Sequence, residues 1–176
     1  MAIDISMTRC MILMTCIGFM ACSGNRKVTA LWESVPLGGK ESVLEVLPSE
    51  YALYQLDIDQ LKQALKNTGS QADEGIFVQF PDPAGTMQNF KVWSSGVVSE
   101  KLKAKYPDLN AYQGFNASEV SVKVRLEVPQ SGLQVMVADG TNTWFIAPFD
   151  PAERLYLVFY KRDLSTENQF WEGRIE

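Results

Sequence analysis

A stretch from Val120 to Val128 alternates without a break between apolar and polar side chains. Successive side chains of a strand point to opposite faces of a sheet, so this pattern predicts a half-buried strand with one face in water. Val120, Val122, Val124, Leu126 and Val128 fall on the apolar side. We expect Val124 and Leu126 to be buried, and Lys123 and Arg125 to face solvent.

The chain continues this strand into an antiparallel meander. Pro129 and Gly132 end the first strand, because proline donates no ladder hydrogen bond and glycine accepts turn dihedrals. Asp139-Gly140 is typical of a type I′ hairpin turn. The other three strands are expected over residues 133–138, 142–147, ending near Pro148, and 154–161, with one face of the meander directed to a core.

The preceding part of the chain predicts further strands and two helices. Residues 51–56 alternate, and Asp57 with Gln60 three residues later is typical of a capped helix start. Residues 75–80 and 87–93 predict a hairpin, Ser99 begins a second short helix that Pro107 stops, and 109–115 is a short extended piece. The fold class predicted is therefore mainly β, an antiparallel sandwich or flattened barrel of about eight strands with two short helices.

The N-terminus is typical of a targeting segment. Arg9 precedes an apolar run, Met11 to Met20, that is too short to span a bilayer. The residues that follow, Ala21-Cys22-Ser23-Gly24, resemble a bacterial lipobox, which implies lipidation of Cys22 and a membrane-anchored protein of the bacterial cell envelope whose domain lies outside the cytoplasm. A plain secretory signal or a short N-terminal anchor is the alternative interpretation.

These features divide the chain into four parts. Residues 1–22 are the expected lipoprotein-type signal peptide, and 23–42 a tether with Gly38-Gly39. Leu31 and Trp32 are its apolar exceptions, which are expected to dock onto the domain or to recognise a partner. Residues 43–164 form one β domain, large enough to hold a core without disulfides, and 165–176 are a C-terminal tail.

Composition argues against most kinds of catalytic or binding site. The chain has no histidine, and its three cysteines, Cys10, Cys16 and Cys22, all precede the expected domain. This excludes Ser-His-Asp and Cys-His catalysis and histidine-based zinc sites. The acidic residues lack calcium-loop spacing, and a net charge of −5 disfavours nucleic acid. We therefore expect a protein that is not an enzyme, with no catalytic, metal or cofactor residue.

Aromatic residues are numerous enough to line a ligand groove, but most of them occupy positions of strand alternation. Packing in the core and between strands is therefore favoured over a ligand site. The residues concerned are Trp93, Tyr112, Phe115, Trp144, Phe145, Tyr156, Phe159 and Tyr160.

Much of the expected domain resembles the N-terminal propeptide of bacterial secreted reprolysin-like (adamalysin-type) zinc metalloproteases. The resemblance opens at Tyr51-Ala-Leu-Tyr-Gln-Leu-Asp and is strongest at Leu102-Lys-Ala-Lys-Tyr-Pro-Asp-Leu-Asn-Ala-Tyr-Gln-Gly. It also includes Phe80-Pro-Asp-Pro-Ala-Gly, Asn89-Phe-Lys-Val-Trp, Gly132-Leu-Gln-Val-Met and Tyr156-Leu-Val-Phe-Tyr-Lys-Arg-Asp-Leu. Such proteases carry their zinc-binding helix in a separate domain after the propeptide, and this chain has no histidine to form one.

The resemblance implies a non-catalytic, membrane-tethered, propeptide-like domain that binds another protein, such as a separately encoded metalloprotease. Two alternatives remain open. One is a lipoprotein whose β-sandwich or barrel holds a small lipid or sugar ligand, and the other is the remnant of a truncated metalloprotease precursor. A large apolar pocket at a barrel end favours ligand binding, whereas an unpaired strand edge favours protein binding.

Overall fold

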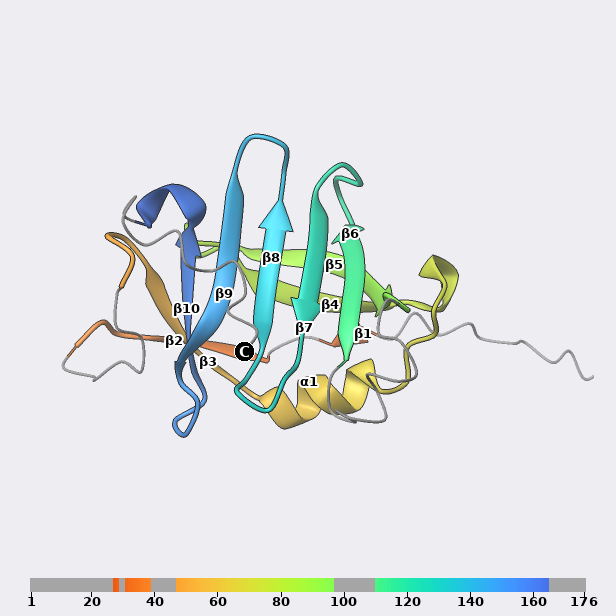
Figure 1. Cartoon of the computed structure of the whole chain (residues 1–176), viewed down its shortest axis with the longest axis horizontal. Coiled ribbons are helices and arrows are strands. Elements are labelled where there is room, and N and C mark those ends of the chain that lie inside the picture. Colours follow the sequence, from red (N-terminus) through yellow and green to blue (C-terminus); the bar gives the residue numbers. More distant parts are fainter. Residues whose placement is uncertain (1–26, 29–30, 39–46, 97–109, 165–176) are drawn as a thin grey trace, which may run out of the picture.

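The computed structural model of the chain describes residues 27–28, 31–38, 47–96 and 110–164. Within these residues, ten strands form one sheet that curls into a nearly closed barrel, with one α-helix and two short 3-10 turns (Figure 1). The mainly β fold predicted from the sequence is therefore confirmed. The second predicted helix, which begins at Ser99, lies outside the described residues.

The sheet runs in the order β1-β4-β5-β6-β7-β8-β9-β10-β3-β2, so each strand from β4 to β10 lies beside its neighbour in sequence. All pairings are antiparallel except the parallel pairing of β1 with β4. The strands are β1 Lys27–Val28, β2 Trp32–Val35, β3 Ala52–Leu56, β4 Ile76–Pro81, β5 Met87–Ser94, β6 Ala111–Asn116, β7 Lys123–Glu127, β8 Gln134–Ala138, β9 Thr143–Asp150 and β10 Leu155–Tyr160.

The seam of the barrel is bridged at one point by Trp32, from a segment that the sequence placed in a tether. β1 pairs with β4, while β2 pairs with β3 at the opposite end of the sheet. The Trp32 indole N–H donates a 2.8 Å hydrogen bond to the Gln79 carbonyl of β4, which links the two ends. Leu31 is buried in the core. β1 and β2 thus belong to the sheet, and Leu31 and Trp32 add their apolar side chains to the core.

β7 follows its predicted alternation closely. Val124 and Leu126 are buried, and Lys123 and Arg125 are exposed, as expected. Val120, which was expected on the apolar side, is instead 57% exposed. The Asn116 carboxamide accepts hydrogen bonds from the Ser118 and Glu119 N–H groups, and this turn delays the start of the strand to Lys123.

Two turns of the meander differ from the prediction. Asp139 and Asn142 bracket the β8–β9 loop, whose central residues are Gly140 and Thr141. Of these only Gly140 has positive φ, 85°, so the turn is not type I′. β9 also continues through Pro148 to Asp150 instead of ending there. Its register against β10 shifts beside Pro148, and this bulge tolerates a residue without an N–H.

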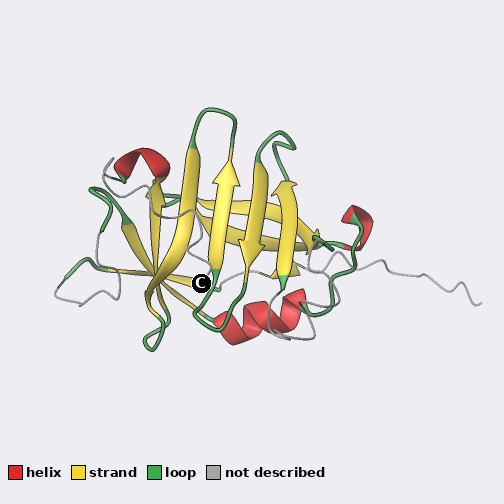
Figure 2. Cartoon of the chain, viewed as in Figure 1, coloured by secondary structure: helices red, strands yellow, loops and turns green. Residues whose placement is uncertain are grey.

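Helix α1, Ile58–Leu65, lies across one end of the barrel (Figure 2). The Asp57 carboxylate accepts a 3.1 Å hydrogen bond from the Gln60 N–H, as the capping pattern predicted. Leu61 and Leu65, one turn apart, are buried in the barrel core. The two 3-10 turns are Ala72–Glu74 and Lys161–Asp163.

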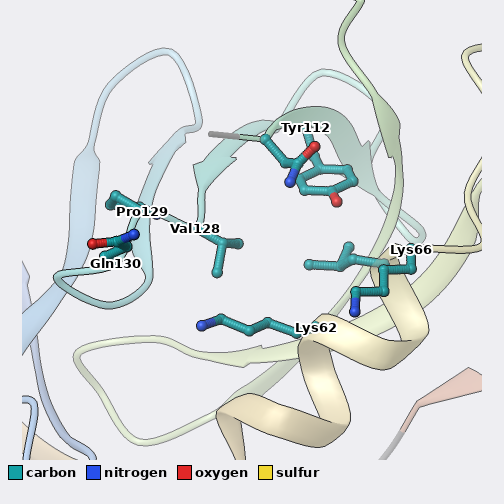
Figure 3. A pocket seen from close by; sticks show the side chains of 8 residues that line it. Lys62, Lys66, Tyr112, Val128, Pro129 and Gln130 are labelled. Atoms are coloured by element: carbon teal, nitrogen blue, oxygen red, sulfur yellow. The ribbon is translucent and has the colours of Figure 1, made fainter. Parts of the chain in front are cut away.

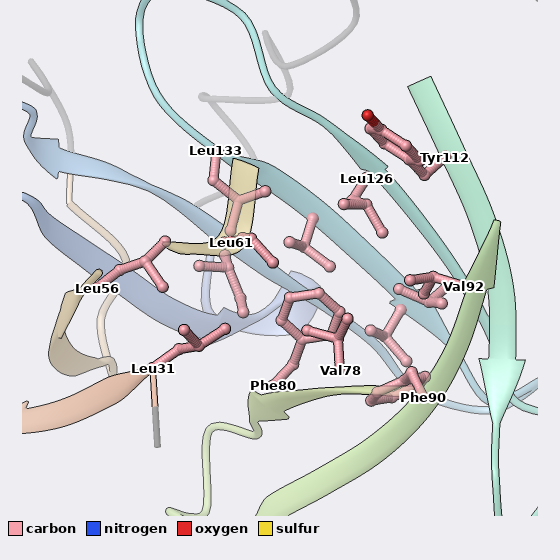
Figure 4. Packing of buried hydrophobic residues seen from close by; sticks show 14 of the residues in the cluster. Leu31, Leu56, Leu61, Val78, Phe80, Phe90, Val92, Tyr112, Leu126 and Leu133 are labelled. Atoms are coloured by element: carbon pink, nitrogen blue, oxygen red, sulfur yellow. The ribbon is translucent and has the colours of Figure 1, made fainter. Parts of the chain in front are cut away.

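Aromatic rings from opposite walls meet inside the barrel. Trp32 packs edge-on against Phe80 and Tyr156, at centroid distances of 6.3 and 5.8 Å. Phe80 packs against Phe90, which in turn contacts Trp144 of β9 at 6.4 Å. Aliphatic residues of the same cluster, among them Leu61 and Val78, surround Phe80 and Phe90 (Figure 4). The barrel interior is therefore a packed core.

A second apolar cluster lies on the outer face of β3, β9 and β10. β10 is buried on both faces, since Tyr156 and Val158 face the barrel core while Leu157 and Phe159 belong to the outer cluster. The cluster consists of Leu53, Ala147, Phe149, Leu155, Leu157 and Phe159, with Val35, Tyr51, Phe145 and Leu164 packed against it. The sheet thus has one core inside and a second apolar layer outside at this end.

Candidate functional site

β2 is the last strand of the sheet, so its outer edge pairs with no described strand. The Asp57 N–H donates a 2.9 Å hydrogen bond to the Leu31 carbonyl. This bond shows which residues of β2 direct their backbone groups toward β3. In an antiparallel pair, hydrogen-bonded and non-hydrogen-bonded positions alternate. The backbone groups of Glu33 and Val35 therefore point to β3, and those of Trp32 and Ser34 point away from it. Trp32 lies at the seam beside β4, so the free edge begins at Ser34.

The free edge is also accessible. Glu33 and Ser34 are exposed, and Leu37, just beyond the strand, is 62% exposed. A row of unpaired backbone donors and acceptors is a template for an added strand from another chain. Val35, on the outer face of β2, packs against the outer apolar cluster, so the edge and that cluster are continuous.

A groove extends the outer apolar face from β10 toward β7. Its volume is about 480 Å³, and half-buried Phe145 and Met136 provide much of its apolar surface. Arg125 and Glu127 of β7 place opposite charges along one side. The residues that line this outer groove are Arg125, Leu126, Glu127, Gln134, Met136, Phe145, Ile146, Ala147, Phe159 and Leu164.

The buried polar side chains Asp82 and Asn116 form hydrogen bonds that hold neighbouring turns in place. The Asp82 carboxylate accepts from the Thr86 N–H at 2.8 Å and from the Gln88 carboxamide at 2.9 Å. Gln88 in turn accepts a 2.8 Å hydrogen bond from the Asn116 carboxamide. This network fixes the β4–β5 turn against the start of the 116–122 turn. Within the described residues no group of three potential ligands could hold a metal ion.

The predicted lipidation site, Cys22, lies outside the described residues, as do the signal peptide and the C-terminal tail. The aromatic residues singled out in the sequence divide between several environments. Tyr112, Trp144 and Tyr156 are in the barrel core, whereas Phe145 and Phe159 line the outer groove. Trp93 and Phe115 form a half-buried pair with ring centroids 5.6 Å apart.

Sequence reasoning missed the free edge of β2, because residues 32–35 are few and were placed in a tether. The apolar pair Leu31-Trp32 indicated contact with the domain, and both residues pack on the core, but the pair did not indicate a strand. The outer groove was also missed, although the uniformly apolar sequence of β10 indicated burial on both faces.

Comparison with known proteins finds no matching family model, no matching curated protein and no matching solved structure. Among the described residues, no helix is long and apolar enough to cross a membrane. The residues and surfaces described above therefore carry the functional argument.

Proposed function

We propose that this chain is a non-catalytic, membrane-tethered domain that binds another protein by strand addition at β2. The observation that carries the proposal is the outward backbone of Ser34, which is exposed and pairs with no described strand. A partner strand placed there lies beside Val35 and the outer apolar cluster, which supply side-chain contacts.

The packed barrel supports protein binding over a ligand inside the barrel. Trp32, Phe80, Phe90 and Trp144 form a continuous series of ring contacts across the interior. A lipid or sugar held there would have to displace these rings and leave their buried surface uncovered, because protein cores are close-packed.

The partner we propose is a separately encoded metalloprotease catalytic domain, following the resemblance of the sequence to reprolysin-like propeptides. The absence of histidine throughout the chain is consistent with a domain that acts on a protease by occupying its surface. With no cysteine after Cys22, the folded domain would contact its partner without a thiol–zinc bond.

Substitution of Ser34 tests the binding edge directly. Ser34→Pro removes the outward N–H without removing a donor to β3, since a proline is tolerated where the N–H faces solvent. Ser34→Ala, the matched control, keeps the backbone donor. We expect wild type and Ser34→Ala to retain the same protein from detergent-solubilised envelopes, and Ser34→Pro to retain at least about tenfold less, because the ring also obstructs the added strand.

Equal retention by Ser34→Pro, with its thermal unfolding unchanged, would exclude strand addition at β2. Mass spectrometry of the retained protein tests the second half of the proposal, because a partner without a metalloprotease domain excludes the protease assignment. For the tether, Cys22→Ser should release the folded chain from the membrane fraction, and an N-terminus intact upstream of Cys22 would contradict lipidation.

A further inference from the structure

A second, smaller pocket lies at the end of the barrel that carries α1, apart from the β2 edge. Its volume is about 230 Å³. Lys62 and Lys66 project from α1 on one side, and Val128 and Pro129 follow β7 on the other (Figure 3). Tyr112 of β6 forms the wall between them.

The two lysines give this pocket a positive charge, and no described carboxylate forms an ion pair with either of them. They are one helical turn apart, Lys62 in the last turn of α1 and Lys66 at its C-cap, so both side chains leave the same face of the helix. In the described part of the chain, ion pairs join Arg154 to Asp59 and Arg162 to Asp163, and neither lysine takes part in one. Two lysines without a described ion-pair partner thus line this pocket on a chain whose net charge is −5.

The Tyr112 hydroxyl is an unused hydrogen-bond donor in the same pocket. The side chain is only 8% exposed, yet its hydroxyl has no hydrogen-bond partner among the described residues. Figure 3 shows the phenol oxygen directed toward the helix that carries the lysines. Burial raises the pKa of Tyr112, so the hydroxyl keeps its proton at neutral pH.

Tyr156, which is buried to a similar extent, shows what such a hydroxyl does when it has a structural role. Its oxygen accepts a 3.3 Å hydrogen bond from the buried Leu133 N–H. The Tyr112 hydroxyl is not among the buried polar atoms that lack a partner, so its oxygen is open to the pocket and able to donate to a ligand there. The ligand must accept a hydrogen bond and carry negative charge.

We propose that this pocket binds a phosphate monoester, with Lys62 and Lys66 neutralising the phosphate and the Tyr112 hydroxyl donating a hydrogen bond to one phosphate oxygen. Two lysine cations match the charge of a phosphate dianion, and lysine serves phosphate as a point charge. A planar carboxylate is better matched by the fork of an arginine, and no arginine is among the residues lining this pocket. Val128 and Pro129 provide an apolar wall for the organic part of the ester.

Isothermal titration calorimetry of the whole chain in detergent, at constant ionic strength, tests the proposal. Three probes share the phosphate group: inorganic phosphate, glycerol 3-phosphate and dihexanoyl phosphatidic acid below its micelle concentration. Saturable binding of glycerol 3-phosphate is the expected result. Tighter binding of the phosphatidic acid would assign the site to a lipid headgroup, and equal binding of inorganic phosphate would assign it to the free ion.

Variants then separate binding from structure. Tyr112→Phe should weaken glycerol 3-phosphate binding by about tenfold, because it removes a hydrogen bond to a charged acceptor. Lys62→Met and Lys66→Met should each weaken binding by about fivefold. Lys161→Gln, which removes the same charge from outside this pocket, should leave binding unchanged.

A purely structural role for the lysines makes a different prediction. Cations in the last turn of a helix stabilise its C-terminal end, so Lys62→Met would then lower the melting temperature without altering phosphate binding. That result would overturn the proposal, as would the failure of all three probes to bind or an equal loss of binding in Lys161→Gln. Tyr112→Phe distinguishes the two roles, because the hydroxyl that it removes makes no hydrogen bond to a described residue. A loss of binding in this variant therefore reports on the ligand and not on folding.

Discussion

β7 and β10 belong to the same meander, but they meet their surroundings in different ways. In β7 every second side chain is in water, whereas five of the six residues of β10 are buried. The polar residues of β7 mark its exposed face, and β10 has no charged residue to mark one. The comparison teaches that alternation predicts a strand with one wet face, while an uninterrupted apolar strand indicates a second layer over the sheet.

The largest effect that distinguishes the two strands should come from Phe159→Ala. Phe159 is 2% exposed and lies in the outer cluster, away from the barrel core. If the outer layer is part of the cooperative fold, the substitution should lower the free energy of unfolding by about 3–5 kcal/mol, as for a core phenylalanine. Urea denaturation measures this, and a loss below about 1 kcal/mol would mean that the outer face is only weakly covered.

Neighbouring substitutions in β7 should have unequal effects. Leu126→Ala, at a position 1% exposed, should cost about 2–5 kcal/mol. Arg125→Ala, on the exposed face, should stay within about 0.5 kcal/mol. The same urea titrations provide the measurement. Comparable losses from both would show that the second face of β7 is covered as well, and the contrast with β10 would then disappear.

A pair of tyrosine substitutions extends the comparison to polar groups. Tyr156→Phe on β10 leaves the buried Leu133 N–H without its acceptor, at a cost of about 1–3 kcal/mol. Tyr112→Phe on β6, beside Leu126 of β7, removes a hydroxyl without a described partner and should stay within about 0.5 kcal/mol. Thermal unfolding of both variants tests this, and equal destabilisation would contradict the assignment of the two hydroxyls.

The smallest effect concerns the hairpin between β8 and β9, at the boundary between the two regions. The backbone N–H of Asn142 is the main cause that lowers the pKa of Asp139, and Thr141 contributes further hydrogen bonds. The folded-state pKa is below the unfolded value of 3.8, so this stabilisation is present above that pH and is lost as the pH falls through the folded value. Asp139→Asn should therefore flatten the acid limb of a stability–pH curve slightly, and an unchanged limb would contradict this.

The sequence predicted what local patterns determine. The alternation of β7, the buried residues of β8 and the Asp57 cap of α1 each depend on neighbours within a few residues, and each is confirmed. The passage of β9 through Pro148 was not predictable, because it depends on a register shift against β10.

The closure of the barrel and the candidate sites depend on contacts between distant segments. The Trp32 indole N–H donates to the Gln79 carbonyl across the seam, and no local sequence pattern predicts such a contact. The pocket lined by Lys62 and Tyr112 combines α1, β6 and the end of β7, which come together only in the folded chain. For the seam and for the pocket, the sequence shows the types of residue but does not indicate which of them are in contact in the folded chain.

The pairing of β3 with β10 has a consequence for the order in which the domain forms. Tyr54 lies opposite Tyr156, roughly 100 residues further along the chain, whereas β4 to β10 join consecutive neighbours. During synthesis β3 leaves the ribosome long before β10 is made. Its apolar residues therefore stay exposed to solvent while the hairpins that follow it form. Closure of the barrel should then be the late, slow step of folding, as expected for a pairing of high sequence separation. A nascent chain that ends before Leu155 contains all of β2 and β3 but lacks β10. The pair of β2 and β3 would then have no strand that joins it to the rest of the sheet.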